Sequence, residues 1–278
     1  MRFIKNLAFG YRSYFKAIKF IIEHKLYWYF FIPAVLMLVI YKIGEMIRNH
    51  YIPPNAENMN ELVWYLIYLL LEITVAILLM KFAKYLVVII LSPLLSSLSM
   101  KTEKVLTGNT YPFNWHQLVM DIKRAMRIVV RNMMWEYLIF ILILIIAFFI
   151  GGDDFSKSPL FYFTFLVGCY YYGFGFLDYI NERRRLDMDQ SIIFVRDHRG
   201  LSIAIGSIYS LLIFVPVDVG ALFDWSNFEI LRFLTHLLLW LCASAAPILA
   251  IVAATIAMDD LVDLKTNVYS QKMDNLAD

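Results

Sequence analysis

The ionisable side chains of this chain concentrate in residues 178–200, which read DYINERRRLDMDQSIIFVRDHRG. Five arginines face five carboxylates within this stretch, which we call the charged hub. A segment with this many charged side chains cannot lie in hydrocarbon. Its arginines favour the cytoplasmic side of the membrane, so we predict that the hub lies in the cytoplasm. The hub side chains that are candidates for a polar pathway are Asp178, Arg183, Arg184, Arg185 and Arg196.

Two single carboxylates outside the hub are further candidates for a polar pathway. Glu72 lies inside a long apolar block, and Asp218 lies near an expected turn. An intramembrane carboxylate is a functional candidate by default, although a structural pair with a lysine or a tyrosine hydroxyl explains Glu72 equally well.

The sequence contains no combination of residues typical of an enzyme. The five histidines are scattered without metal-ligand spacing, and no nucleophile elbow, phosphate loop or dinucleotide fingerprint is present. Asp259 and Asp260 are adjacent, so on a helix they point about 100° apart and share no face. We therefore expect no enzyme activity, no cofactor and no metal site.

Composition places the candidate residues in a membrane. Of the 278 residues, 61% are hydrophobic and only 17% are charged, which is typical of an all-α integral membrane protein. The net charge of +2 and the absence of a nucleic-acid motif argue against nucleic acid as a partner. We treat residues 1–278 as one membrane domain.

Residues 1–25 show the pattern of a basic amphipathic helix lying on an anionic lipid surface. Its basic side carries Lys5, Arg12, Lys16 and Lys19, and the opposite side carries Phe3, Leu7, Tyr11, Tyr14, Phe15, Ile18 and Ile22. Residues 26–43 form a first predicted span, with aromatic residues at its start and Pro33 predicting a kink.

A second predicted span covers residues 62–84, and two predicted helical hairpins cover residues 133–177 and 201–258. The hairpin arms are short, so full crossings and re-entrant hairpins remain two alternatives. An acidic tail, residues 259–278, follows. Lysine and arginine cluster before the first span, in residues 101–132 and in the hub, which places these segments and both termini in the cytoplasm.

Several segments, in this order, resemble the CysZ-type sulfate permeases and the wider etoposide-induced membrane-protein family. They are FGYRSYFKAIKFI, YFFIP, LSPLLSSLSMKTEKVLTG, the charged hub and APILAIVAATI. The resemblance implies an amphipathic N-terminal helix, two long transmembrane helices and two hemi-penetrating hairpins. It also implies homo-oligomers and, in bacterial members, sulfate uptake across the cytoplasmic (inner) membrane.

The family's sulfate-binding turn precedes its first long helix, and the matching place here makes His24, Lys25 and Leu26 the anion-binding candidates. Lysine supplies a point charge where arginine would offer a bidentate fork. The alternative is that Lys25 extends to lipid phosphate beside the aromatic residues. We expect uptake of sulfate or a similar small oxyanion; the alternative function is a non-transporting scaffold that binds or stabilises other membrane proteins.

Overall fold

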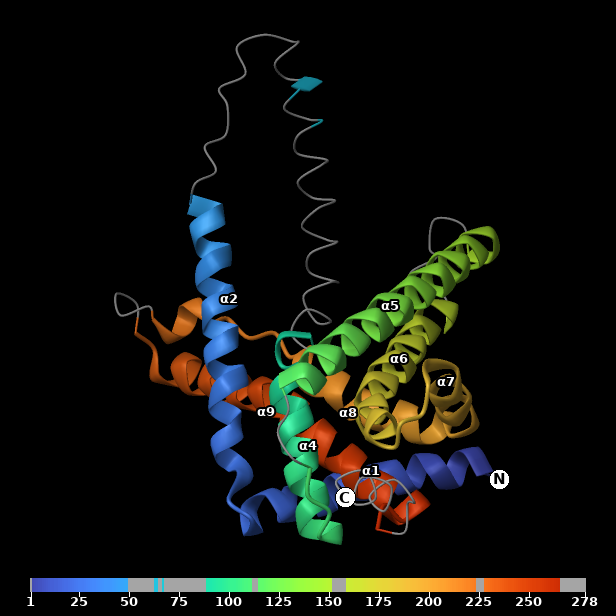
Figure 1. Cartoon of the computed structure of the whole chain (residues 1–278). Helices are drawn as coiled ribbons and strands as arrows, with labels where there is room; N and C mark the ends of the chain where they lie inside the picture. Colours follow the sequence, from blue (N-terminus) through green and yellow to red (C-terminus); the bar gives the residue numbers. More distant parts are fainter. Residues whose placement is uncertain are drawn as a thin grey trace.

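The structure is a computed structural model, and it describes residues 2–49, 63, 64, 67, 89–111, 115–151, 159–223 and 228–265. All regular elements in these residues are helices, which confirms the all-α fold class (Figure 1). In order they are α1 (Arg2–Glu23), η1 (Leu26–Phe30), α2 (Phe31–Asn49), α4 (Ser92–Thr107), α5 (Trp115–Gly151), α6 (Pro159–Arg183), α7 (Met188–Asp197), α8 (Arg199–Ile213), η3 (Gly220–Leu222) and α9 (Ile230–Val262).

Helix α1 presents three faces, where the sequence predicted two. One face packs on α8 and α9 and buries Ala17 and Tyr14, whose hydroxyl donates to the Ile205 carbonyl at 2.6 Å. Tyr14 was predicted on the lipid side, but it faces protein. The second face is basic, and the third is exposed and apolar, with Ile4, Phe15, Ile18 and Ile22. Only this third face is available to lipid.

The chain turns sharply between α1 and α2. Lys25 adopts the left-handed backbone conformation, with φ 54° and ψ 38°, and the two helices meet at a bend of 107°. The short helix η1 leads into α2, which begins at Phe31. Pro33 therefore lies in the first turn of α2, where no intrahelical donor is lost. The predicted kink at Pro33 is replaced by this turn before the helix.

Two described helices are long and apolar enough to cross a membrane, namely Ile122–Ala147 within α5 and Ile230–Val262. The bent pair of α1 and α2 would be a third if it forms one span. These two long helices lie in the segments predicted as hairpins, and α5 begins at Trp115, well before residue 133. Most of the predicted span 62–84, including Glu72, lies outside the described residues.

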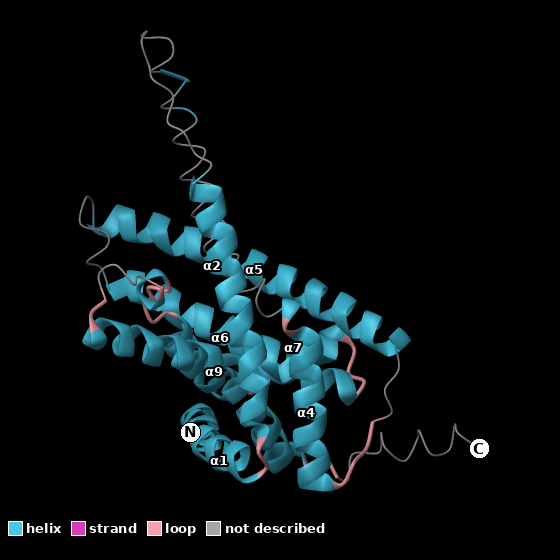
Figure 2. Ribbon diagram, turned by 90° about the vertical axis from the view of Figure 1, so that its left-hand side faces the viewer, coloured by secondary structure: helices cyan, strands magenta, loops and turns pink. Residues whose placement is uncertain are grey.

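Helix α8 lies at the centre of the packing, in contact with α1, α6 and α9. It buries Leu201, Ile205 and Tyr209 completely. It approaches α6 so closely that a Cβ on Gly173 or Gly206 would lie 1.8 Å from a carbonyl oxygen of the facing helix. Helix α6 itself runs back beside α5 (Figure 2). Glycine at the crossing is therefore a steric requirement.

Helix α9 changes character along its length. In its first half, Leu231 and Leu238 are 69% and 62% exposed. In its second half, residues 250–258 are all buried. The second half is enclosed by α1, α4, α6 and α8, so only the first half offers an apolar surface to lipid.

Candidate functional site

Arg183 of the hub forms a buried ion pair with Glu103 of α4. Its Nε lies 2.9 Å from Glu103 Oε2, and the two side chains are 8% and 3% exposed. Its Nη2 donates to Ser99 Oγ at 2.7 Å, and Ser99 in turn lies 2.6 Å from Thr255 Oγ1 of α9. The guanidinium thus joins α4, α6 and α9.

The loop after α4 completes the coordination of Glu103. Tyr111 donates its hydroxyl to Glu103 Oε1, and Asn109 Nδ2 donates to the same oxygen at 3.3 Å. Burial, followed by the hydrogen bond to Glu103, raises the pKa of Tyr111, so the hydroxyl keeps its proton at neutral pH. Every oxygen of this carboxylate therefore has a partner.

Asp178 forms a second buried cluster, with Arg124 of α5. The two Arg124–Asp178 hydrogen bonds measure 3.3 Å from Nε and 3.0 Å from Nη2, a bidentate arrangement. Ser191 of α7 also donates to Asp178 Oδ1 at 2.6 Å, and Arg124 donates to the Leu186 carbonyl at 2.6 Å. The hub charges at the end of α6 are therefore tied to α4, α5 and α7.

The remaining hub arginines have different surroundings. Arg184 lies 5.1 Å from the ring centroid of Phe194, and burial lowers the pKa of its guanidinium. Arg185 is exposed and has a left-handed φ of 51°. Arg196 is also exposed.

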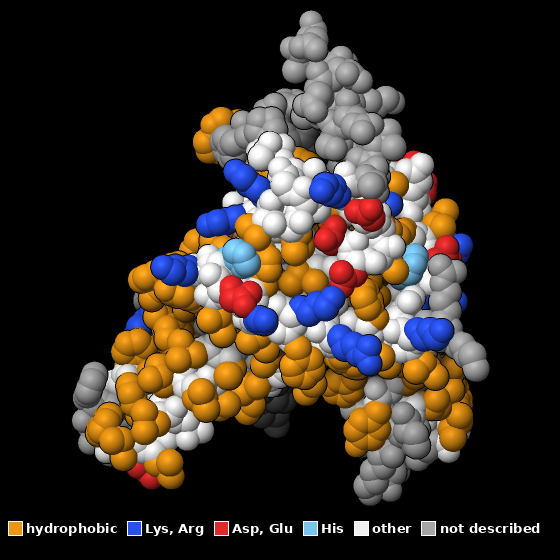
Figure 3. Space-filling view, turned by 90° about the horizontal axis from the view of Figure 1, so that it is seen from below, with side chains coloured by type: hydrophobic (Ala, Val, Ile, Leu, Met, Phe, Trp, Pro, Cys, Tyr) orange, Lys and Arg blue, Asp and Glu red, His pale blue; other side chains and the backbone are white. Residues whose placement is uncertain are grey.

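The underside of the molecule carries Lys and Arg with Asp and Glu among them (Figure 3).

Residues 24–26 diverge at the turn after α1. His24 lies over Phe20, with ring centroids 4.2 Å apart, and Leu26 is completely buried. Lys25 is exposed, and no described residue makes a hydrogen bond or ion pair with its ammonium. Glu23, which would oppose an anion there, lies 3.6 Å from Lys19. Lys25 is the member of the predicted trio that a soluble anion can reach.

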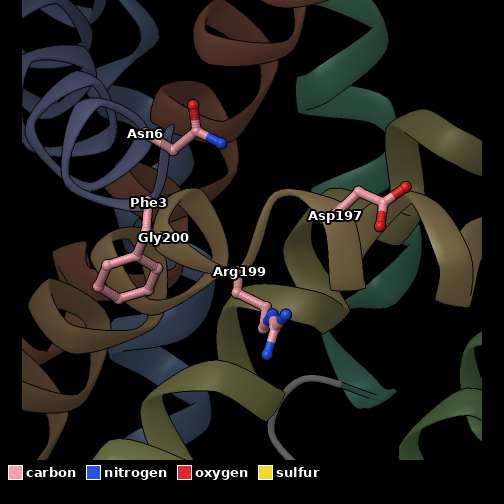
Figure 4. Close-up of a pocket in the computed structure, with 5 residues that line it drawn as sticks. All are labelled: Phe3, Asn6, Asp197, Arg199 and Gly200. Carbon is pink, nitrogen blue, oxygen red and sulfur yellow. The ribbon is translucent and has the colours of Figure 1, made fainter. Parts of the chain in front are cut away.

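A surface pocket of about 410 Å³ lies between the start of α1 and the turn from α7 to α8. Phe3 and Asn6 line it with Gly200 beside them, and Arg199 and Asp197 lie farther along the turn (Figure 4). Its two charged residues have opposite signs, so the pocket offers no net attraction to an anion.

Asp218 lies between α8 and α9, at the tip of the second hairpin. Its Oδ2 accepts from Arg232 Nη2 at 2.9 Å, and its backbone N–H donates to His236 Nδ1 at 3.1 Å. The structure therefore brings Asp178 and Arg183 into neighbouring buried clusters, but it does not bring either of them to Lys25 or Asp218.

Sequence reasoning missed three charged residues. Glu103 and Arg124 are partners of hub residues, and no local spacing identifies them. Glu136 lies inside the candidate span Ile122–Ala147, with its Oε1 only 3.2 Å from where a Cβ on Gly168 would stand. A lone carboxylate in an apolar run was the signal that singled out Glu72, and it would also have found Glu136.

Comparison with known protein families gives one result for this chain. The family described as Sulfate transporter CysZ/Etoposide-induced protein 2.4 matches residues 13–223, which include the Lys25 turn and the whole hub. No individual curated protein matches the chain significantly.

Proposed function

Because that match covers more than half of its length, the chain belongs to the EI24 family (Sulfate transporter CysZ/Etoposide-induced protein 2.4), and we propose that it is a permease for sulfate or a similar small oxyanion. The family is transporter-like and includes sulfate transporters, and the chain is a membrane protein with apolar spans. We also propose a homo-oligomer in a bacterial cytoplasmic membrane, with both termini in the cytoplasm.

The observation that carries the proposal is the exposed ammonium of Lys25 at the junction between α1 and α2. The resemblance of this segment to the family's sulfate-binding turn supports the assignment, and no described residue pairs with the ammonium. The carboxylate of Glu23, two positions before Lys25, lies 3.6 Å from the ammonium of Lys19. A positive charge at the membrane surface, where a surface helix meets a membrane helix, can collect an anion from water.

The arginines of the two clusters around Glu103 and Asp178 have a different role in this proposal. Arg183 and Arg124 each contact a carboxylate at 3.0 Å or less, and their side chains are 8% and 21% exposed. An anion could reach them only by displacing a buried carboxylate, which is energetically costly. In this proposal, Arg183 and Arg124 therefore stabilise the helix packing, and Lys25 binds the anion.

The test is radiolabelled sulfate flux into proteoliposomes, normalised to inserted protein. Lys25→Glu should reduce flux by about tenfold or more, since a charge-assisted hydrogen bond contributes roughly 1.5–3 kcal/mol, and Lys25→Arg should preserve it. Lys5→Glu is the matched control, because it makes the same charge change at an exposed position near the other end of α1, and it should retain flux.

Equal flux per molecule for Lys25→Glu and the parent protein would remove the site assignment. A parent protein that carries no sulfate but purifies with a stoichiometric membrane partner would replace the permease with the scaffold.

A further inference from the structure

A second group of charged side chains lies where the tip of the second hairpin meets α2. Arg232 and His236 of α9 contact Asp218, as described above. On the α2 side, the Tyr41 hydroxyl lies 2.7 Å from where a Cβ on Gly220 would stand. The ammonium of Lys42 lies 5.7 Å from the ring centroid of Phe223, in the same tip. We call Lys42, Asp218, Arg232 and His236 the tip cluster.

The register of α2 sets the depth of the tip cluster in a membrane. The exposed apolar face of α1 and the 63% exposed Trp28 mark the membrane surface just before Phe31. Lys42 follows Phe31 by eleven residues, or about 17 Å of helix. The hydrocarbon layer is about 30 Å thick, so Lys42 lies near its middle when α2 runs along the membrane normal, and the tip cluster lies beside Lys42.

Charges at that depth need water or other polar groups around them. The side chains of Arg232 and Asp218 are 44% and 47% exposed in the protomer. Exposed charges are not tolerated against lipid tails, so in a membrane this surface must face water or the polar groups of another protomer. An aqueous space halfway across the membrane is a route for a hydrophilic solute.

The donors of the tip cluster suit an anion. Arg232 gives one terminal nitrogen to Asp218, and its guanidinium has further N–H donors. With Nδ1 of neutral His236 accepting from the backbone, its Nε2 carries the proton and donates. Lys42 adds an ammonium. Of the described residues, Asp218 is the carboxylate that contacts Arg232, and the exposed Glu229 precedes α9.

We propose that Lys42, Arg232 and His236 form a second anion-binding subsite at mid-membrane depth, which takes a small inorganic oxyanion such as sulfate; this rests on the proposed permease function. Asp218 accepts from one terminal nitrogen of Arg232 at 2.9 Å and so takes up part of its donor capacity. Its negative charge also keeps anion affinity low, and a permeation site must release its ion as readily as it binds it.

Flux kinetics separate this subsite from a merely structural ion pair. Arg232→Gln and Lys42→Gln should each raise the KM for sulfate by about tenfold, because each removes a charge close to the anion. Arg232→Lys should retain the parent KM within about threefold, since it keeps the charge. Asp218→Asn should lower the KM. A structural pair would instead make Asp218→Asn and Arg232→Gln equally harmful, and that result would overturn the proposal.

Thiol labelling tests the subsite without sulfate flux. In a chain lacking Cys169 and Cys242, Phe223→Cys places a thiol beside Lys42. An anionic methanethiosulfonate should react with it about tenfold faster than a cationic one, and Arg232→Gln should abolish the preference. Sulfate should slow the anionic reaction.

Equal rates for the two reagents, or a thiol that reacts with neither, would overturn the subsite. If the parent protein carries no sulfate, the permease proposal fails, and the charge preference of this labelling still decides whether the tip cluster attracts anions.

Discussion

The crossing of α6 and α8 yields a prediction whose magnitude follows from the geometry. An alanine Cβ at position 173 would lie 1.8 Å from the Ser202 carbonyl oxygen, and one at position 206 would lie 1.8 Å from the Cys169 carbonyl oxygen. Ordinary contact begins near 3.4 Å, so either Gly173→Ala or Gly206→Ala must separate the helices by about 1.5 Å. Both clashing atoms belong to backbone, which cannot swing aside.

The separation also breaks a hydrogen bond at the crossing. Ser202 Oγ donates to the Tyr170 carbonyl at 2.7 Å, and this bond cannot survive the movement. We estimate about 1 kcal/mol for the bond and about 1–3 kcal/mol for the strain, or roughly 2–4 kcal/mol in total. This should lower the apparent Tm by roughly 5–15 °C in a protein of this size.

The assay is thermal unfolding in detergent, followed by size-exclusion chromatography. Gly175→Ala is the matched control, because it lies on the same helix and a Cβ there meets no atom within 4 Å. It should leave the Tm unchanged or raise it slightly, since alanine favours a helix by about 1 kcal/mol over glycine. The double variant Gly173→Ala/Gly206→Ala should cost less than the sum, because one movement relieves both clashes. A Tm for Gly173→Ala equal to that of Gly175→Ala would refute the reasoning.

Three further predictions concern the hub and α1. Arg183→Ala should destabilise the protein by about 3–5 kcal/mol, because it leaves the buried carboxylate of Glu103 without its ion-pair partner. Arg185→Gly should be neutral or slightly stabilising, because residue 185 is exposed and has a left-handed backbone conformation that glycine adopts easily. Thermal unfolding of both variants measures the difference. Asp187→Ala removes the capping box of α7 and should cost about 1 kcal/mol, seen as faster amide exchange in the first turn of that helix. The double variant Phe15→Ser/Ile22→Ser should leave stability in detergent unchanged but increase amide exchange of α1 in liposomes, because these exposed side chains contact lipid and not the core. Amide exchange of α1 in liposomes equal to that of the parent protein would contradict this.

Local patterns predicted the helices of this protein better than their partners. The periodicity of residues 1–25 predicts α1, and the density of charge in residues 178–200 predicts a segment outside hydrocarbon. The pairs that hold the hub together are Arg124 with Asp178 and Arg183 with Glu103, which are 54 and 80 positions apart. No sequence spacing relates residues at such distances, so these partners appear only once the helices are packed.

The third face of α1 shows a second limit of sequence reasoning in membrane proteins. Apolar residues that face lipid and apolar residues that face protein have the same chemistry, so periodicity alone cannot separate Tyr14 from Phe15. Packing separates them, because Tyr14 is 5% exposed and Phe15 is 75% exposed. For the candidate anion site, the sequence identified Lys25, but the tip cluster needed the structure, because Lys42 and Arg232 come from helices far apart in the chain.

The contact between α1 and α9 has a consequence for how the protein is made. Lys16 of α1 pairs with Asp260 of α9, 244 positions later in the chain. Because synthesis proceeds from the N-terminus, α1 leaves the ribosome long before the helix that covers its protein-facing side exists. The exposed apolar face of α1 allows the helix to bind the lipid surface until α8 and α9 have been synthesised. The core can close only when the last helix arrives, because α9 covers α1 together with α8, so a chain terminated before α9 would leave part of the protein-facing side of α1 exposed.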